Sequence, residues 1–87
     1  MLSLSKCTDL QLSYHPHIVQ DGFGFDILDP KIERLLDQYA IHGWEFWFRH
    51  LDTGHVCAVT EEGWSVNYAP VLFFADRDDA FAVKMRL

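Results

Sequence analysis

The residues best suited to chemistry in this chain are its histidines and cysteines. Five His and two Cys occur in 87 residues, and imidazole nitrogen and thiolate sulfur are preferred zinc ligands. Four of them form two i, i+2 pairs, which share a strand face if the segments are extended. These four are His15, His17, His55 and Cys57. They are one hypothesis for a metal site, although their spacing differs from the close Cys or His pairs typical of structural zinc sites.

Catalytic groups are harder to assemble. Cys57 with His55 or His50 could supply a nucleophile and a base, but they flank the turn of a predicted hairpin and not a helix N-terminus. No glycine pattern of the phosphate-binding kind is present. The sequence therefore predicts a non-catalytic protein without a cofactor. The alternative is a metal-binding or small catalytic domain that uses the four His and Cys residues.

Aromatic residues are the feature most in excess. Seven Phe, three Trp and three Tyr make up 15% of the chain. This exceeds what one small core readily hides, and Trp and Tyr are frequent in binding hot spots. A strand sandwiched between two layers would use the same rings as core, so both interpretations stay open. The predicted partner-binding residues are Trp47, Glu45, Arg49, His50, Trp64 and Tyr68.

The charge balance narrows the class of partner. Thirteen acidic residues oppose seven basic ones, for a net charge of -6. Nucleic acids and anionic membranes attract Lys and Arg, so neither is an expected partner. The first nine residues carry one lysine and no continuous apolar stretch. We therefore expect no secretory signal or membrane span, and a cytoplasmic protein.

The clearest predicted element is a helix over about 30–42. Asp29 can cap it, and Pro30 suits its first position because the missing N–H would be unpaired there. Apolar residues then recur at helical spacing and define one buried face. They are Ile32, Leu35, Leu36, Tyr39 and Ala40. Gly43 is expected to end the helix.

Strand patterns occupy much of the remaining chain. Alternating or continuous apolar segments predict strands over 10–14, 23–27, 44–51, 56–60 and 71–75, with a further extended piece over 64–68 before Ala69 and Pro70. Segments 44–51 and 56–60 form a hairpin around the turn 52–55. Alternation directs Trp44, Phe46 and Phe48 toward the helix and leaves Glu45, Trp47 and Arg49 on the far face. The continuous run 71–75 predicts a central strand.

The C-terminal segment supports two interpretations. Asp76 and Asp79 resemble a capping box that would start a helix over about 77–86. That helix would place Ala80, Val83 and Leu87, with Phe81 and Met85, on one apolar face. The same residues alternate as a strand would, but helix formers dominate and favour the helix. The predicted fold is α+β: a single domain over 1–87 with an antiparallel sheet of about four or five strands and these two helices.

The segment 71–87 resembles the end of small bacteriophage-encoded proteins, in which an aromatic strand is followed by acids and then D-A-x-x-F-K-L-R. Here the corresponding run is Asp79-Ala80-Phe81-Ala82-Val83-Lys84-Met85-Arg86, with Val83 and Met85 in place of Phe and Leu. The resemblance implies a virus or mobile element as source. It also implies a protein that binds and inhibits host machinery, for example a CRISPR effector or transcription machinery. A homodimer with a structural role is a further hypothesis.

Overall fold

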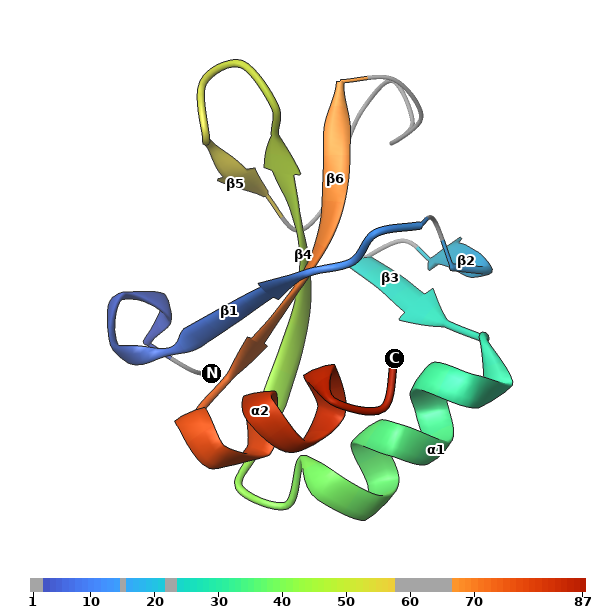
Figure 1. Cartoon of the computed structure of the whole chain (residues 1–87). Helices are drawn as coiled ribbons and strands as arrows, with labels where there is room; N and C mark the ends of the chain where they lie inside the picture. Colours follow the sequence, from blue (N-terminus) through green and yellow to red (C-terminus); the bar gives the residue numbers. More distant parts are fainter. Residues whose placement is uncertain (1–2, 15, 22–23, 58–66) are drawn as a thin grey trace.

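The structure contains both strands and helices, as the sequence predicts. The computed structural model describes residues 3–14, 16–21, 24–57 and 67–87. In chain order, the elements are η1 (Leu4–Lys6), β1 (Thr8–Gln11), β2 (Ile18–Asp21), β3 (Gly24–Ile27), α1 (Pro30–Tyr39), β4 (Trp44–His50), β5 (Val56–Cys57), β6 (Tyr68–Phe74) and α2 (Arg77–Lys84) (Figure 1). The predicted α+β class is confirmed.

A four-stranded antiparallel sheet with the order β1-β6-β4-β5 forms the centre of the fold. β6 lies between β1 and β4, which confirms the predicted central strand. It begins earlier than predicted, at Tyr68, and runs through Pro70. The amide of Leu12 donates to the carbonyl of Pro70 (N–O 2.9 Å) just where β1 ends. The missing N–H of Pro70 thus falls at the end of the β1–β6 ladder, where its loss is tolerated.

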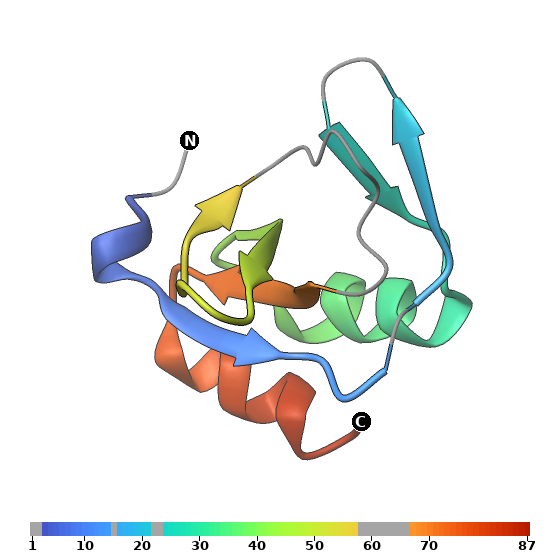
Figure 2. The same cartoon turned by 90° about the horizontal axis from the view of Figure 1, so that it is seen from above.

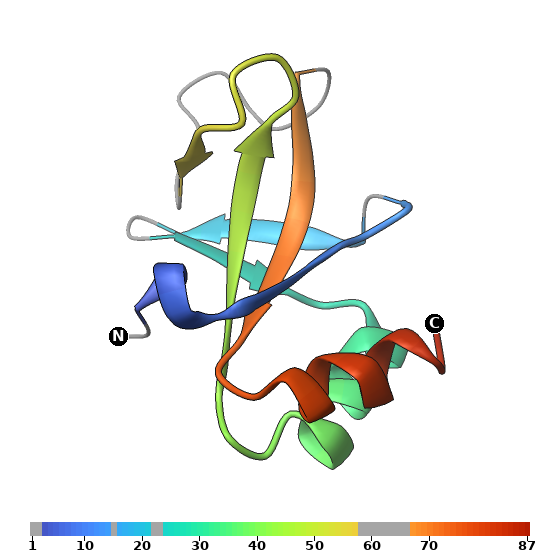
Figure 3. The same cartoon turned by 60° about the vertical axis from the view of Figure 1, so that its left-hand side comes forward.

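The N-terminal third departs from the prediction. The strand expected over 10–14 is Thr8–Gln11, and Ile18–Asp21, which was not predicted, is a strand that pairs with Gly24–Ile27. These two strands make a separate hairpin, which runs across the direction of β4 and β6 (Figure 3). The alternating pattern that continues through Leu12 predicted a strand that begins and ends too late. Leu12 is buried in the core although it lies just past the end of β1, so its apolar side chain does not mark a strand residue.

Both helices pack on the same face of the sheet. In α1, Asp29 caps the helix through its carboxylate (Oδ1 to the Lys31 amide, 3.0 Å), as predicted. The helix ends at Tyr39, three residues early, and Gly43 in the following loop has a positive φ of 110°. The core joins residues of both helices to residues from the two sheets and the adjoining loops: Leu12, Ile27, Ile32, Leu36, Ala40, Leu72, Phe74, Ala80 and Val83. Figure 2 shows α1 and α2 side by side below β6.

The C-terminal helix is confirmed, but its orientation corrects the predicted apolar face. Ala80 and Val83 are buried, whereas Phe81 and Met85 are 63% and 66% exposed. An eight-residue helix meets the sheet along a narrow i, i+3 stripe, so positions one or two residues further round face outward. The predicted capping box is also incomplete, because Asp76 caps α2 but the carboxylate of Asp79 binds His42. Neither α1 nor α2 is long and apolar enough to cross a lipid bilayer.

Candidate functional site: a cationic groove between β1 and α2

A groove lies between the first strand and the last helix. Its volume is about 210 Å³, and its lining is Thr8, Asp9, Leu10, Arg77, Ala80, Phe81 and Lys84. The α2 residues follow an i, i+3, i+4, i+7 pattern, so they form one continuous stripe of the helix. Leu10 and Ala80 also pack in the core, so the floor of the groove rests on buried residues. Phe81 forms an exposed apolar wall.

Two cations border this groove. Within the described residues, neither Arg77 nor Lys84 forms an ion pair. The acid in the groove, Asp9, is engaged by Arg49 of β4 (Nη2–Oδ2 2.7 Å). The groove therefore presents positive charge on a chain whose net charge is -6. This local reversal of sign favours acidic ligands.

The groove also runs along an open sheet edge. β1 pairs with β6 on one side and has no strand on its other side among the described residues. Because the Leu12 amide bonds to β6, alternation directs the backbone groups of Asp9 and Gln11 away from β6. An open edge of this kind can accept an added strand.

Three of the four predicted binding residues on β4 lie on one face of the sheet. Glu45, Trp47 and Arg49 share the face opposite the helices, as predicted, and pair with Phe73, Val71 and Ala69 of β6, respectively. Trp47 is half-buried, and its Nε1–H donates to Glu45 (Oε2, 3.3 Å). Of the residues predicted to face the helix, Phe48 is fully buried and Phe46 is partly buried, whereas Trp44 is 37% exposed.

His50 and Tyr68 lie elsewhere. Alternation places His50 on the opposite face of β4 from Trp47, where its ring meets that of Tyr68 edge-on (centroids 5.0 Å apart). His50 Nδ1 accepts hydrogen bonds from the Asp52 and Thr53 amides (3.2 and 3.3 Å), which holds the hairpin turn. Trp64 lies outside the described residues. The structure thus brings three of the six predicted residues onto one face.

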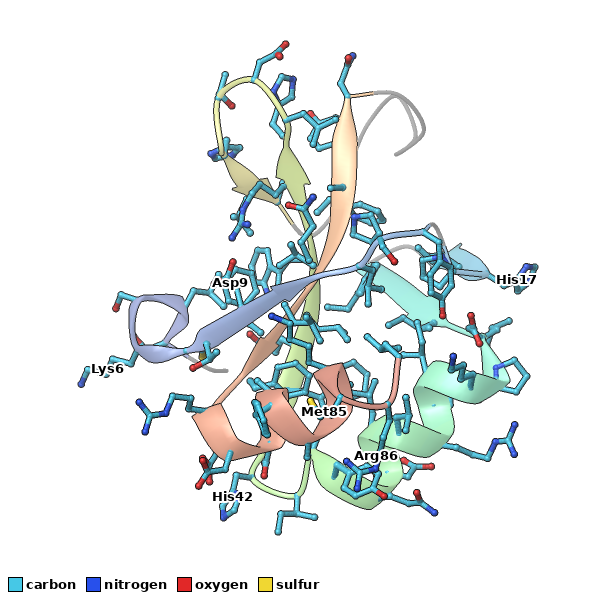
Figure 4. The ribbon with its side chains drawn as sticks, viewed as in Figure 1. Lys6, Asp9, His17, His42, Met85 and Arg86 are labelled. Atoms are coloured by element: carbon cyan, nitrogen blue, oxygen red, sulfur yellow. The ribbon has the colours of Figure 1, made fainter. Side chains whose placement is uncertain are left out.

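The histidines and cysteine considered for metal binding are not gathered into one site in the described part of the chain. His15 lies outside the described residues, and His17 lies beside the β2–β3 hairpin (Figure 4). His55 immediately precedes β5 and Cys57 is the last residue of that strand, on the return arm of the β4–β5 hairpin. Burial raises the pKa of the Cys57 thiol, which works against the thiolate that nucleophilic catalysis and metal binding need.

A different set of metal-ligating groups does come together. His42, in the loop between α1 and β4, meets Asp76 and Asp79 at the start of α2, and one ligand atom from each lies within 4.8 Å of the others. This cluster was not predicted from the sequence, because His42 lies more than 30 residues before the two aspartates along the chain. The only local signals were a histidine at a helix end and two aspartates at a helix start.

The groove was not predicted either, because β1 and α2 lie at opposite ends of the chain. The local signal for it was the stripe of cationic and apolar residues on α2, in a segment whose sequence also fits a strand. Comparison with protein-family models, with curated proteins and with solved structures found no match to this chain.

Proposed function

We propose that this protein is a non-catalytic protein-binding module, and that the groove between β1 and α2 receives an extended, acidic segment of its partner. The observation that carries the proposal is the combination of the exposed Phe81 ring with two cations that lack an ion pair in the described structure. A large exposed apolar side chain is common at binding surfaces when it belongs to a patch. Met85 extends that patch along α2.

The size of the groove supports a protein segment as the ligand. At about 210 Å³, it is smaller than the roughly 300 Å³ and upward of typical small-molecule sites. The open edge of β1 offers backbone hydrogen bonds to a chain lying beside it, and the pocket between Leu10 and Phe81 suits one apolar side chain. Arg77 and Lys84 favour acidic residues flanking that side chain. A two-fold dimer through this groove would bring the two cations of each copy against those of the other.

The face of Trp47 remains a predicted contact in this proposal. Asp9 lines the groove and is joined to Arg49, a neighbour of Trp47 on the same face of β4. A partner that extends past β1 would therefore reach Trp47. The resemblance of residues 71–87 to phage proteins favours a host protein as this partner.

The test is a selection of random displayed peptides on the whole protein, followed by affinity measurements with the enriched peptides. We expect enrichment of extended peptides that carry an apolar residue flanked by Asp or Glu, with amide shift changes in Thr8–Gln11. Arg77→Glu should weaken binding at least about fivefold because it reverses a charge beside the ligand. Lys31→Glu is the matched control, since Lys31 lies in the first turn of the other helix.

Three results would overturn the proposal. One is a selection without enrichment. Another is a set of peptides that bind the Arg77→Glu and Lys84→Glu variants as tightly as the wild type. The third is a doubled mass in light scattering that Phe81→Ser abolishes, which would give the surface to a second copy of the chain.

A further inference from the structure

Three carboxylate oxygens converge on a single imidazole nitrogen at the start of α2. His42 Nδ1 lies 3.1 Å from Asp76 Oδ2 and 3.0 and 3.2 Å from Asp79 Oδ2 and Oδ1. One nitrogen carries at most one proton on this side, so a single N–H faces three acceptors. The cluster therefore has more acceptor atoms than donors.

The shortage is greatest at Asp79. Its side chain is 7% exposed, and in the described part of the chain its only donors are the ring of His42 and the His42 amide (N–Oδ2 2.9 Å). A buried carboxylate has about four acceptor positions and is costly to leave undersatisfied. The ring is also shared with Asp76, whose other oxygen, Oδ1, accepts from the Asp78 amide (2.9 Å) as the helix cap. A cation would meet the unsatisfied acceptors.

We propose that His42, Asp76 and Asp79 form a binding site for one divalent transition-metal cation of the zinc class, with His42 Nδ1, Asp76 Oδ2 and an Asp79 oxygen as ligands. Two ligand atoms bound at about 2.1 Å, with an angle of about 90 to 110° at the metal, are about 3.0 to 3.4 Å apart. The nitrogen–oxygen distances above fall at the lower end of this range. All three ligand atoms lie within 4.8 Å of one another, and rotation of the exposed His42 ring and the partly exposed Asp76 side chain can bring them to this spacing.

The donor set selects the class of cation. One imidazole nitrogen with two carboxylate oxygens suits zinc and its transition-metal neighbours, whereas magnesium and calcium prefer oxygen alone. Three carboxylates within residues 76–79, offset by Arg77, add local negative charge. The positive end of the α2 dipole opposes a cation, but its effect is smaller than that of two full charges in contact.

The site would be open and would fasten two parts of the fold together. The side chain of His42 is 55% exposed, so three protein ligands would leave remaining positions to water. The ligands join the loop after α1 to the start of α2, a junction already tied by the Ala75 amide and the Gly43 carbonyl (3.1 Å). In Figure 4, His42 lies at the lower end of the molecule, far from His17. The inference does not depend on the proposed protein-binding function.

Two variants remove a ligand while keeping the local fold. His42→Ala keeps the backbone amide that donates to Asp79, and Asp76→Ser keeps a side chain able to cap α2. His17→Ala is the matched control, an exposed histidine outside the cluster. The protein is stripped with a chelator and titrated by calorimetry with zinc, cobalt and magnesium chlorides at neutral pH.

We expect one zinc ion per chain, at least about tenfold weaker binding in His42→Ala and Asp76→Ser, and unchanged binding in His17→Ala. Substoichiometric cobalt should broaden the NMR signals of His42, Asp76 and Asp79 first in the wild type, a readout independent of variant folding. Cobalt absorption should lack a sulfur charge-transfer band. Zinc should raise the melting temperature of the wild type.

The inference is overturned if the wild type binds no zinc at millimolar concentration, which would leave the cluster as a hydrogen-bonded contact between His42 and the two aspartates. It is also overturned if His42→Ala and Asp76→Ser retain full affinity. Retained binding that Cys57→Ser abolishes would assign the metal to the histidine and cysteine set suggested by the sequence.

Discussion

Arg49 and Asp9 join the two strands that flank β6, with Nη2 and Oδ2 2.7 Å apart. Their register partners on β6, Ala69 and Phe73, are four residues apart, or roughly 13 Å along a strand. In Figure 1, β1 crosses β6 and β4 at a steep angle, and this twist of the sheet shortens the distance between the two side chains. Val71, midway between those partners on the same face, is fully buried. The ion pair also removes the charge of Asp9 from the groove beside it.

Replacing Asp9 tests that consequence. Asp9→Asn leaves Arg49 unpaired beside the groove, so an acidic peptide that binds there should bind about two- to fivefold more tightly, and more so at low salt. The free energy of unfolding should fall by less than about 1 kcal/mol, because both side chains are partly exposed. Fluorescence anisotropy and urea denaturation measure the two effects. Weaker peptide binding in the variant would contradict the assignment of charge in the groove.

Truncation of Trp47 and truncation of Phe81 are predicted to change the stability of the protein by different amounts. Trp47→Ala should lower the free energy of unfolding by about 2 kcal/mol, because the half-buried ring lies opposite the fully buried Val71. Phe81→Ala should change it by less than about 0.5 kcal/mol, because the ring is mostly exposed, while it weakens peptide binding about tenfold. Chemical denaturation compares them. Equal losses of stability would show that Phe81 is also part of the core.

Two isoleucines, Ile32 in α1 and Ile41 in the turn after it, form a matched pair. Ile32 is fully buried and Ile41 is 73% exposed. Ile32→Ala should cost about 2 to 5 kcal/mol of stability through lost burial and the remaining cavity. Ile41→Ala should cost less than about 0.5 kcal/mol. A near-neutral Ile32→Ala, measured by the same denaturation, would mean that α1 does not pack as described.

The reactivity of Cys57 tests the catalytic alternative. Burial raises the pKa of this thiol above its ordinary value of 9.0, so little thiolate forms near neutral pH. In a Cys7→Ser background, the rate of alkylation by iodoacetamide should still be rising at about pH 9. A rate that reaches a plateau below about pH 8 would indicate an activated cysteine and revive a nucleophile with His55 or His50 as its base.

Because of Tyr14, the stability of the protein is predicted to fall as the pH rises in the alkaline range. Its hydroxyl donates to Asp29 Oδ2 (3.1 Å), and burial first, then the hydrogen bond and the charge of Asp29, raise its pKa above 10.0. The folded state thus holds the phenol proton more tightly than the unfolded state. The resulting stability is fully present below about pH 10 and is lost as pH rises through the folded pKa.

The control is Tyr14→Phe, which lacks the titrating group. The wild type should be more stable than the variant at pH 8 in urea denaturation, and the difference should shrink steadily above about pH 10. A difference that stays constant to pH 11 would mean that the hydroxyl does not interact with Asp29.

The sequence by itself determined the elements whose signals are local. The carboxylate of Asp29, the ring of Pro30 and the apolar spacing after them predict α1, because capping and helical periodicity act within a few residues. Strand alternation likewise predicted which side of β4 carries Trp47. It did not predict β2, and it favoured a break at Pro70, because a proline is tolerated only in relation to the neighbouring strand.

Only the tertiary structure decided what lies beside what. It brought His42 to Asp79 across 37 residues, joined Asp9 to Arg49, and turned Phe81 outward beside β1. Such contacts depend on register, on the coiling of the sheet and on the rotation of α2 about its axis. No short stretch of sequence encodes these quantities, because each is set by the packing of several distant elements against one core.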